Sequence, residues 1–410
     1  MARATQPGSA TVGRRVVVVG GGFGGVRATA QLAGHHGLHV TLISNHHTFA
    51  YYPQFYHSAT GGSRAEVAIK LGSIFRRRPV HLVHDTITTL DALAHTVTGT
   101  SGATYEYDYL VLALGSVTNY FGIDGLEEYS YDIKTIDGAE HFKRHLHREL
   151  LDSRGETRHF AVVGGGPTGV ELSAAIGHYL RRIARQHRLP APPIHVHLVE
   201  AAPRLLPRAE ADFAARVQRQ LERLGVSILT NAMVKSETMR ALNLPDRTIR
   251  TETVVWTAGA ANNPFYQANA ASFTLNKAGR VVVDDHLLAA PHVYVLGDNA
   301  DTPFSGYAQT AIRDANFAAQ DIWRTVRGHP RPAYRPVKPV NVIPVGQHWA
   351  AAEWGPFRVY GYLGYLLRRA ADLIGYADVE RWPAALRVWL QDGAHANGCR
   401  ICAQTPGPRV

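Results

Sequence analysis

The sequence has very little cysteine, and both cysteines lie close to its end. Among 410 residues only Cys399 and Cys402 occur, which excludes a disulfide framework and fits a reducing, cytoplasmic setting. The pair forms one C-x-x-C, at most half of a structural zinc site. His395 or a second subunit would have to complete such a site, and more often such a tail is an exposed, reducible dithiol or has no function. We therefore predict no metal.

Long apolar runs are also missing. No stretch of about 18 or more apolar residues occurs, the minimum for a spanning helix, so we expect any membrane contact to be made from the surface. Residues 1–13 are small and polar and lack the apolar core of a signal peptide. We therefore expect no export.

Acidic residues are the scarcer charged residues. Lys and Arg number 43 against 33 Asp and Glu, a formal net charge of +10, which favours anionic partners such as lipid headgroups, nucleotides or nucleic acid. Neither a basic tract nor an aromatic-basic RNA-binding pattern is present, so we expect no nucleic-acid partner. Hydrophobic residues make up 45% of the chain, an ordinary share for a globular protein, and the length allows two or three domains.

The sequence does contain one β-α-β pattern twice. Residues 15–19 predict a buried strand, residues 26–32 a helix and residues 38–43 a second strand. The pattern recurs at residues 160–163, 170–185 and 194–199, and further short strands are expected at 109–114, 253–257 and 293–296. We predict an α/β fold with two Rossmann-like dinucleotide-binding domains, the second inserted in the first.

A glycine-rich turn follows the first strand of each pattern. Residues 20–25 fit G-x-G-x-x-G directly between a strand and a helix. Gly20 permits the tight turn, Gly22 lets the backbone approach a pyrophosphate, and Gly25 lets helix and strand pack closely. Residues 164–169 repeat the motif, with Pro167 where a helix tolerates a missing N–H. Two copies indicate two bound dinucleotides.

The strand after each turn ends differently in the two patterns. Glu200 ends the second strand of the second pattern, where a carboxylate usually binds the ribose 2′-hydroxyl and repels a 2′-phosphate. We therefore expect NADH rather than NADPH there. In the first pattern the equivalent residues are Ser44 and Asn45, which carry no charge, so a weaker hold on the ribose is expected.

The order and spacing of these segments resemble the two-dinucleotide flavoproteins and, within them, the type II, non-proton-pumping NADH:quinone oxidoreductases. The resemblance covers residues 14–325 and is carried by residues 20–25, 48–53, 59–62, 109–115, 164–171, 256–259, 295–298 and 308–311. It implies that the first turn binds FAD and the second binds NADH.

The resemblance also implies which residues bind each nucleotide. For FAD they are Gly20, Gly22, Phe23, Gly24, Gly25, Ser44, Ala113, Gly115, Asp298, Ala308 and Gln309. For NADH they are Gly164, Gly166, Pro167, Thr168, Gly169, Glu171, Glu200, Ala258 and Gly259. The predicted domains are residues 14–118 and 276–328 for FAD and residues 119–275 for NADH.

Two residues are predicted to be catalytic. Glu171 resembles the family's glutamate near the nicotinamide and the flavin, where partial burial would raise its pKa and let it steer NADH or pass protons. An acid in the first turns of a helix is also favoured by the helix dipole, and the two roles are compatible. Gln309 begins a helix similar to the family's quinone-site A-Q-x-A-x-Q. Arg313 replaces the second glutamine, and it could bind a quinone carbonyl, pair with Asp314 or reject a neutral ring.

Residues 340–410 form a separate C-terminal section after a proline-rich stretch at 330–339, which predicts a stiff linker. In residues 359–375, helical spacing groups Gly361, Arg368, Arg369 and Asp372 apart from Leu363, Leu366, Leu367, Leu373 and Ile374. A second apolar face contains Trp382, Leu386, Trp389 and Leu390, beside Arg381 and Arg387. Such amphipathic helices suit a membrane headgroup region, or packing on the core or a second subunit.

No cysteine precedes Cys399, so the redox-active thiols of disulfide reductases are absent and electrons must pass straight to a docked acceptor. We predict an FAD-dependent enzyme that takes hydride from NADH and reduces a membrane quinone, peripheral on the inner face of the cell membrane, with a homodimer possible. The alternatives are a soluble NAD(P)H-dependent reductase with a protein or dye acceptor, and a flavin- and NADH-binding regulatory protein.

Overall fold

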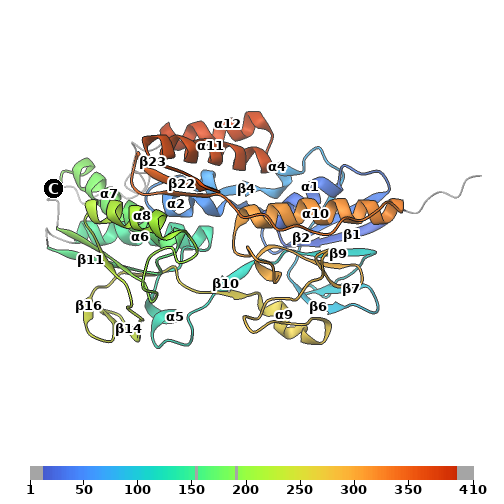
Figure 1. Cartoon of the computed structure of the whole chain (residues 1–410), viewed down its shortest axis with the longest axis horizontal. Coiled ribbons are helices and arrows are strands. Elements are labelled where there is room, and N and C mark those ends of the chain that lie inside the picture. Colours follow the sequence, from blue (N-terminus) through green and yellow to red (C-terminus); the bar gives the residue numbers. More distant parts are fainter. Residues whose placement is uncertain (1–12, 153–155, 190–192, 395–410) are drawn as a thin grey trace, which may run out of the picture. The chain divides into compact units, whose positions relative to one another are not determined.

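The chain forms two compact units in the computed structural model, which describes residues 13–152, 156–189 and 193–394. The first unit contains the described residues up to Phe49 with Lys70–Ser116 and Asn262–Pro339; the second contains Ala50–Ile69, Val117–Ala261 and the described residues from Val340. Both units have parallel strands covered by helices (Figure 1), which confirms the predicted α/β fold class. The boundaries given above for FAD and NADH domains stay predictions, because compactness does not report which ligand a segment binds.

A six-stranded sheet forms the centre of the first unit, in the order β19-β20-β9-β1-β2-β5. Its strands are β1 (Arg14–Val19), β2 (Leu38–Ser44), β5 (Val80–His84), β9 (Tyr109–Leu112), β19 (Leu288–Ala290) and β20 (Val293–Val295). Strand β1 pairs in parallel with β2 and β9, and its four valines are buried. This matches the uniformly apolar run, because a central parallel strand is covered on both faces.

Helices α1 (Phe23–Leu32) and α10 (Ala308–Arg327) lie side by side on this sheet (Figure 1). Helix α1 begins at Phe23, earlier than the predicted residue 26, because Gly22 is its N-cap and Gly24 and Gly25 already take helical geometry. The remaining elements of this unit are α4 (Leu71–Ile74), β6 (Ile87–Asp91), β7 (Thr96–Gly99), β8 (Thr104–Glu106), α9 (Pro264–Ala268), η2 (Ala270–Ser272) and η3 (Gly297–Asn299). The chain crosses between units near β3 (Thr48–Ala50), β4 (Ala68–Lys70), β10 (Ser116–Thr118) and β18 (Ala260–Asn262).

The proline-rich stretch at 330–339 has no regular secondary structure and is tied to α10 by side chains. Arg331 forms an ion pair with the buried Asp321 at 2.5 Å. Arg313 donates a hydrogen bond to the Val337 carbonyl at 2.7 Å. The predicted linker is therefore held along a helix of its own unit.

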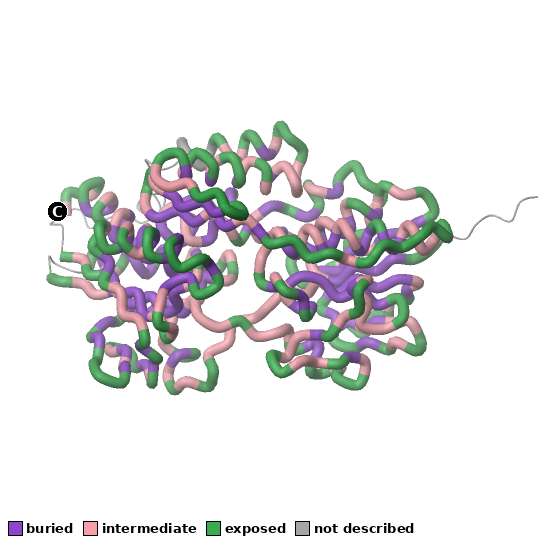
Figure 2. Tube along the Cα trace, in the orientation of Figure 1, coloured by how far each residue is buried: buried purple, intermediate pink, exposed green. Residues whose placement is uncertain are grey.

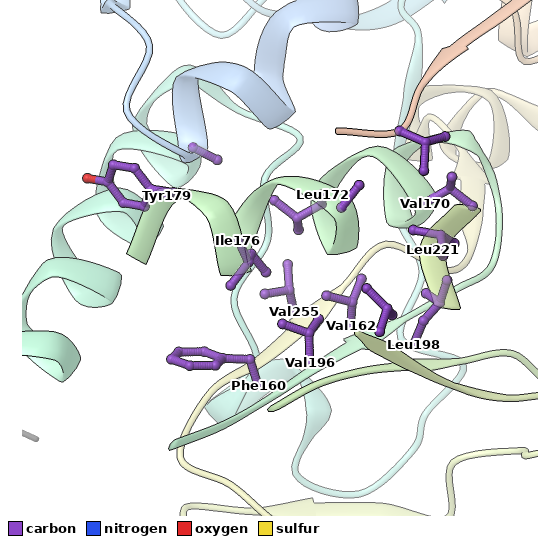
Figure 3. Packing of buried hydrophobic residues seen from close by; sticks show 14 of the residues in the cluster. Phe160, Val162, Val170, Leu172, Ile176, Tyr179, Val196, Leu198, Leu221 and Val255 are labelled. Atoms are coloured by element: carbon purple, nitrogen blue, oxygen red, sulfur yellow. The ribbon is translucent and has the colours of Figure 1, made fainter. Parts of the chain in front are cut away.

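A four-stranded parallel sheet, ordered β13-β12-β11-β17, is the centre of the second unit. Its strands are β11 (Arg158–Val163), β12 (Ile194–Val199), β13 (Val226–Leu229) and β17 (Val254–Trp256). Helix α7 (Pro167–Gln186) packs on this sheet through Val170, Leu172 and Ile176, which meet Val162, Val196 and Val255 (Figure 3). Pro167 occupies the first turn of α7, as its lack of an N–H allows.

Further elements complete the second unit. They are η1 (Tyr52–Gln54), α2 (Phe55–Ala59), α3 (Arg64–Val67), α5 (Leu126–Tyr129), α6 (Ile136–Asp152), α8 (Ala211–Arg223) and the hairpin strands β14 (Ser236–Thr238), β15 (Ala241–Asn243) and β16 (Thr248–Arg250). The C-terminal section adds a three-stranded sheet, β21 (Asn341–Pro344), β22 (Ala350–Trp354) and β23 (Phe357–Gly361), and the helices α11 (Tyr362–Val379) and α12 (Trp382–Ala394).

Helix α11 differs from the prediction in its start and in its orientation. Residues 359–361 belong to β23, so the helix begins at Tyr362. Its charged face is the buried one: Arg368 is 7% exposed and Asp372 3%, whereas Leu363 is 59% and Ile374 58% exposed. Figure 2 shows α11 and α12 as mostly exposed or intermediate ribbon with isolated buried positions. Periodicity found the two faces correctly but could not tell which one is packed.

Candidate active site

The two glycine turns have the same geometry in their separate units. Gly20 and Gly164 have φ of +112° and +113°, a conformation that side chains rarely tolerate. A Cβ on Gly25 would lie 1.8 Å from the Gly20 carbonyl oxygen, and one on Gly169 would lie 1.9 Å from that of Gly164. Each turn therefore requires its glycines for close strand-helix packing.

The middle glycine of each turn faces open space. A Cβ on Gly22 or Gly166 would meet no atom within 4 Å, and both residues are helix N-caps without a side-chain cap. The first N–H groups of α1 and α7 thus remain available for an anion, at the positive end of each helix dipole. Both turns fit the pyrophosphate of a dinucleotide.

Around the first turn, several predicted FAD residues converge at the carboxyl edge of the sheet. Ala113 lies against Gly20, Gly24 lies near Ala113 and Ala311, and Gly297 also lies near Ala311. The first turn of α10, with Ala308 and Gln309, is therefore close to the first turn of α1. Phe23, the first residue of α1, packs edge-on against Phe49.

Asp298 stands at the same edge and accepts a hydrogen bond from the Ser116 hydroxyl at 2.8 Å. Its neighbour Asn299 accepts from the Gly115 N–H at 3.0 Å. The buried Asp314 accepts from the Gly297 N–H at 2.9 Å and from the Tyr334 hydroxyl at 2.5 Å. Asp314 therefore positions the segment that carries Asp298. The suggested pairing of Asp314 with Arg313 is wrong, because Arg313 instead donates a hydrogen bond to the Val337 carbonyl of residues 330–339.

Ser44 is buried where the first pattern lacks an acid. Its hydroxyl accepts a hydrogen bond from the His46 N–H at 3.2 Å, and a Cβ on Gly21 would lie 2.5 Å from it. The hydroxyl is thus beside the glycine turn, in the position of the usual ribose carboxylate.

Around the second turn, Glu200 is tied to the loop itself. Its carboxylate accepts the Gly165 N–H at 2.5 Å and the Ala202 N–H at 2.7 Å. A Cβ on Gly164 would lie 2.7 Å from the Ala258 nitrogen, and Gly259 has positive φ. Pro167 and Thr168, in the first turn of α7, are exposed. The second turn is therefore bounded by the predicted residues Glu200, Ala258 and Gly259.

Glu171, one turn into α7, forms an ion pair with Arg368, which was not among the predicted site residues. Arg368 of α11 donates to Glu171 Oε1 at 3.2 Å and to Asp372 Oδ2 at 3.0 Å. It also donates to the backbone oxygens of Pro53 and Val342 at 2.5 and 3.0 Å. The guanidinium thus joins four segments of the second unit.

This cluster has unusual acid-base properties. Burial raises the pKa of Glu171 from 4.5 to about 7, although the Arg368 charge lowers it. Burial also raises the pKa of Asp372, again against Arg368, and Gln54 donates to Asp372 at 2.9 Å. The expected upward shift at Glu171 is confirmed, and a carboxyl group poised near neutrality can hold or release a proton under working conditions.

A pocket of about 290 Å³ opens beside this ion pair within the second unit. It is bounded by α2, α7, the segment after β21 and α11, with Tyr56, Glu171, His178, Arg182, His348 and Tyr365 among its lining residues. The signal for Arg368 and Asp372 was present in the sequence as two opposite charges four residues apart on one face of an amphipathic helix. Only the tertiary structure shows that they face Glu171.

The described residues contain no cluster of three or more His, Asp, Glu or Cys side chains able to hold a metal, while Cys399 and Cys402 lie outside the described residues. Among the helices of the described chain, none is long and apolar enough to cross a membrane.

Known proteins are similar to this chain in sequence and in fold. The profile of the pyridine nucleotide-disulphide oxidoreductase family matches residues 14–321. The type II NADH:quinone oxidoreductase NdhA of Mycobacterium tuberculosis is 32% identical, over 93% of this chain and 87% of its own. The related Ndh of the same organism is 31% identical, over 88% and 85%.

Solved structures with the same fold have lower identity. NDH2 of Plasmodium falciparum, in complex with NADH, has a TM-score of 0.80 at 16% identity and covers 92% of this chain and 97% of its own. The sulfide:quinone oxidoreductase of Aquifex aeolicus has a TM-score of 0.76 at 18% identity, covering 87% and 89%. The fold and the two glycine turns define an oxidoreductase built on two dinucleotide sites. This chain belongs to the pyridine nucleotide-disulphide oxidoreductases and, within them, to the type II NADH:quinone oxidoreductases, which confirms the resemblance identified in the sequence.

Proposed function

We propose that this chain oxidises NADH and, through bound FAD, reduces a quinone at a membrane surface. The observation that carries the proposal is the repeated glycine turn, with the same φ at Gly20 and Gly164 and the same open space at Gly22 and Gly166. Two equivalent pyrophosphate sites in one chain suit two dinucleotides, and the family supplies their identity. When bound, FAD accepts hydride from the nicotinamide and passes electrons to the acceptor.

The first unit holds FAD in this proposal. The α1 N-terminus and Gly22 receive the pyrophosphate, Ser44 binds the adenosine ribose, and Asp298 binds the polar chain between the phosphates and the flavin. Ser44 offers one uncharged hydroxyl where an acid would offer a charged acceptor, and hydrogen bonds to charged groups are the stronger ones. FAD should therefore be held less tightly than in relatives that have an acid at this position.

The second unit holds NADH. The α7 N-terminus receives the pyrophosphate. The Glu200 carboxylate, which already accepts hydrogen bonds from two backbone N–H groups, has further lone pairs that bind the ribose hydroxyls. A carboxylate at this position repels the phosphate of NADPH. We therefore expect a higher kcat/KM for NADH than for NADPH, and a clear preference for NADPH would show that Glu200 has another role.

Glu171 is the proton-holding group of the proposed reaction. Quinone reduction consumes two protons, and a carboxyl group with a pKa of about 7 is protonated in an appreciable fraction of molecules near neutral pH. Arg368 positions Glu171 and limits the rise in its pKa. Gln309 on the first turn of α10 is the proposed quinone contact, and Arg313 is occupied by the linker backbone.

The exposed face of α11 and α12 supports a peripheral position on the inner face of the cell membrane. Leu363, Leu366 and Leu367 of α11 and Trp382, Leu386 and Leu390 of α12 are all more than 40% exposed. Leucine and tryptophan on the outer face of such helices enter the headgroup region of a bilayer. The same surface would also suit a homodimer, which we propose as the secondary use.

The test is the visible spectrum of the purified protein followed by steady-state turnover. We expect a flavin absorption band, bleaching by NADH, and ping-pong kinetics with a short-chain quinone. Turnover with ferricyanide but no quinone would favour a soluble reductase with a protein or dye acceptor. A reduced flavin that persists in air with slow turnover of every acceptor would favour a regulatory protein.

A further inference from the structure

The pocket beside Glu171 continues along α7 to a basic end that the proposed reaction does not use. Glu171, Ala175, His178 and Arg182 are four, three and four residues apart, so they form one stripe on α7, and all four line the pocket. Eleven residues of helix extend over about 16 Å. One end of the pocket therefore contains the ion pair of Glu171, and the other end contains the imidazole of His178 and the guanidinium of Arg182.

The basic end contains two buried polar atoms without a hydrogen bond, of which the histidine nitrogen donates when it carries the proton. Among the described residues, His178 Nε2 and Arg182 Nε are buried and without a hydrogen bond. A buried polar atom left unpaired is unfavourable, so its presence in a pocket wall indicates a ligand or ordered water there. Arg182 stacks over Tyr179, with its guanidinium carbon 5.6 Å from the ring centre, which fixes its position.

An aromatic chain connects this end to the exposed apolar face of α11. His348, a lining residue, lies edge-on to Tyr365 at 5.3 Å, and Tyr365 lies 5.8 Å from the exposed Tyr362. Leu363 and Leu366, also exposed, flank Tyr362 and Tyr365 on the same helix. A basic hollow and an apolar surface are thus joined by one helix.

We propose that the basic end of this pocket binds the phosphate of an acidic phospholipid, with Arg182 and His178 as donors and the lipid chains along the exposed face of α11. The net charge of +10 favours acidic membranes over neutral ones. A phosphodiester accepts the directed hydrogen bonds that Arg182 and His178 lack. This inference rests on the proposed membrane position and adds a specific lipid class to it.

The test compares the full-length protein with FAD bound, and its variants, on vesicles of phosphatidylcholine alone and of phosphatidylcholine mixed with phosphatidylglycerol. Arg182→Gln should lower the affinity for mixed vesicles about tenfold or more, the worth of a charged hydrogen bond. Arg185→Gln removes the same charge from an exposed position of α7 and should lower it by no more than about fivefold, the worth of one surface charge. Equal losses in the two variants would overturn the proposal.

Two further experiments control for misfolding of the variant and distinguish a lipid phosphate from a free phosphate. Arg182→Lys keeps the charge and should recover part of the affinity, and a folded Lys variant as weak as the Gln variant would contradict the site. Dihexanoyl-phosphatidylglycerol should bind more tightly than glycerol phosphate, and equal binding would mean a free phosphate site instead of a lipid site. Flavin bleaching by NADH, measured on the same samples, reports separately on the proposed function.

Discussion

Glu171 and Arg368 illustrate how one buried ion pair can serve both stability and chemistry. The side chains of both are about one-tenth exposed or less, so the Coulomb attraction between them is little screened, while their desolvation is expensive. Arg368 offsets that cost with hydrogen bonds to Asp372 and to two backbone carbonyls. Burial still outweighs the attraction to Arg368, so the pKa of Glu171 stays above that of an exposed glutamate.

Glu171→Gln should abolish the decline of kcat on the alkaline side of the pH profile. Because burial raises the pKa of Glu171 to about 7, the carboxyl is protonated below that pH and ionised above it. If it donates a proton to the reduced quinone, kcat of the wild type falls as pH rises through about 7. The Gln variant should lose about 100-fold in kcat and lose this pH dependence.

The control for this variant is Glu127→Gln, on the exposed surface of α5, which should leave both kcat and the pH profile unchanged. Profiles of kcat against pH with saturating short-chain quinone make the comparison. An inflection near pH 7 that survives in Glu171→Gln would assign the titration to another group.

Arg368→Met should be strongly destabilising. It leaves Glu171 and Asp372 as buried acids without their cation, and breaking a buried pair by removing one partner costs about 3–5 kcal/mol. Because Arg368 is the group that lowers the pKa of Glu171, the inflection of the kcat profile should also move to higher pH. Arg368→Lys keeps the charge and should recover part of both effects.

Urea unfolding of the wild type and the Arg368 variants measures the free energy of unfolding. The pH dependence of kcat measures the pKa of Glu171. If Arg368→Met is as stable as the wild type and its kcat inflects at the same pH, the contact between Arg368 and Glu171 contributes neither to stability nor to the pKa of Glu171.

At the scale of elements, the two strand-turn-helix segments are nearly interchangeable in geometry and differ in what surrounds them. The first is bounded by Ser44 and Asp298, and the second by Glu200 and Glu171. Glycine motifs predict that a nucleotide binds, but the neighbouring side chains must decide which one. A matched pair of substitutions can therefore test the assignment of FAD to the first turn and NADH to the second.

Gly25→Ala and Gly169→Ala place the same methyl group 1.8 and 1.9 Å from a backbone oxygen in the two turns. Gly25→Ala should purify with little flavin, seen as loss of absorption in the visible spectrum. Gly169→Ala should keep its flavin, which dithionite would still reduce, while KM for NADH rises or bleaching by NADH fails. The reverse pattern would exchange the two assignments.

Helix α11 is the element whose role depends most on its orientation. Its leucines are on the outside although the helix is packed through Arg368, Asp372 and the buried Tyr376, whose hydroxyl donates to the Glu66 carbonyl at 3.0 Å. A large apolar face left exposed while charges are buried indicates a surface made for a partner.

Leu366→Gln should weaken binding to phosphatidylcholine vesicles about tenfold, because burying a leucine stabilises binding by about 1.5–3 kcal/mol. Its unfolding free energy should change by less than about 0.5 kcal/mol, because the side chain is exposed in the protein. Leu151→Gln on α6 changes a similarly exposed leucine, 48% against 45%, and should leave vesicle binding unaltered. Equal effects of the two substitutions would show that α11 is not the docking face.

At the scale of the whole molecule, the excess of basic residues is the property that acts over distance. A net charge of +10 attracts an acidic surface, but salt screens this attraction beyond about 10 Å at 0.1 M. The apolar insertion proposed for the α11 and α12 leucines would not be screened in this way. The two contributions can be separated by ionic strength.

Binding to vesicles that contain phosphatidylglycerol should weaken steadily as sodium chloride is raised, and binding to pure phosphatidylcholine should change little. Sedimentation with vesicles at increasing salt measures both. Binding to acidic vesicles that does not depend on salt would show that the positive charge has no part in docking.

Local chemistry explains which parts of the protein the sequence alone could predict. The glycine turns, the apolar central strands and the position of Glu200 beside the second turn follow from short-range rules. A tight turn, a buried parallel strand and an acid at the end of the next strand each need particular residue types at fixed spacing. The α/β fold and the family were therefore readable from the chain. The start of α1 was missed by three residues because Gly22 caps a helix that glycine propensity would have delayed.

The tertiary structure decided what depends on residues far apart in the chain. Glu171 and Arg368 are 197 residues apart, and no periodicity connects them. The amphipathic pattern of α11 is the same whether its charged or its apolar face is packed, so only the presence of Glu171, Gln54 and Pro53 beside it determines that the charges turn inward. Arg313 likewise has a quinone-site position in the sequence and a linker-binding role in the fold, because the carbonyls it binds are brought to it by residues 330–339.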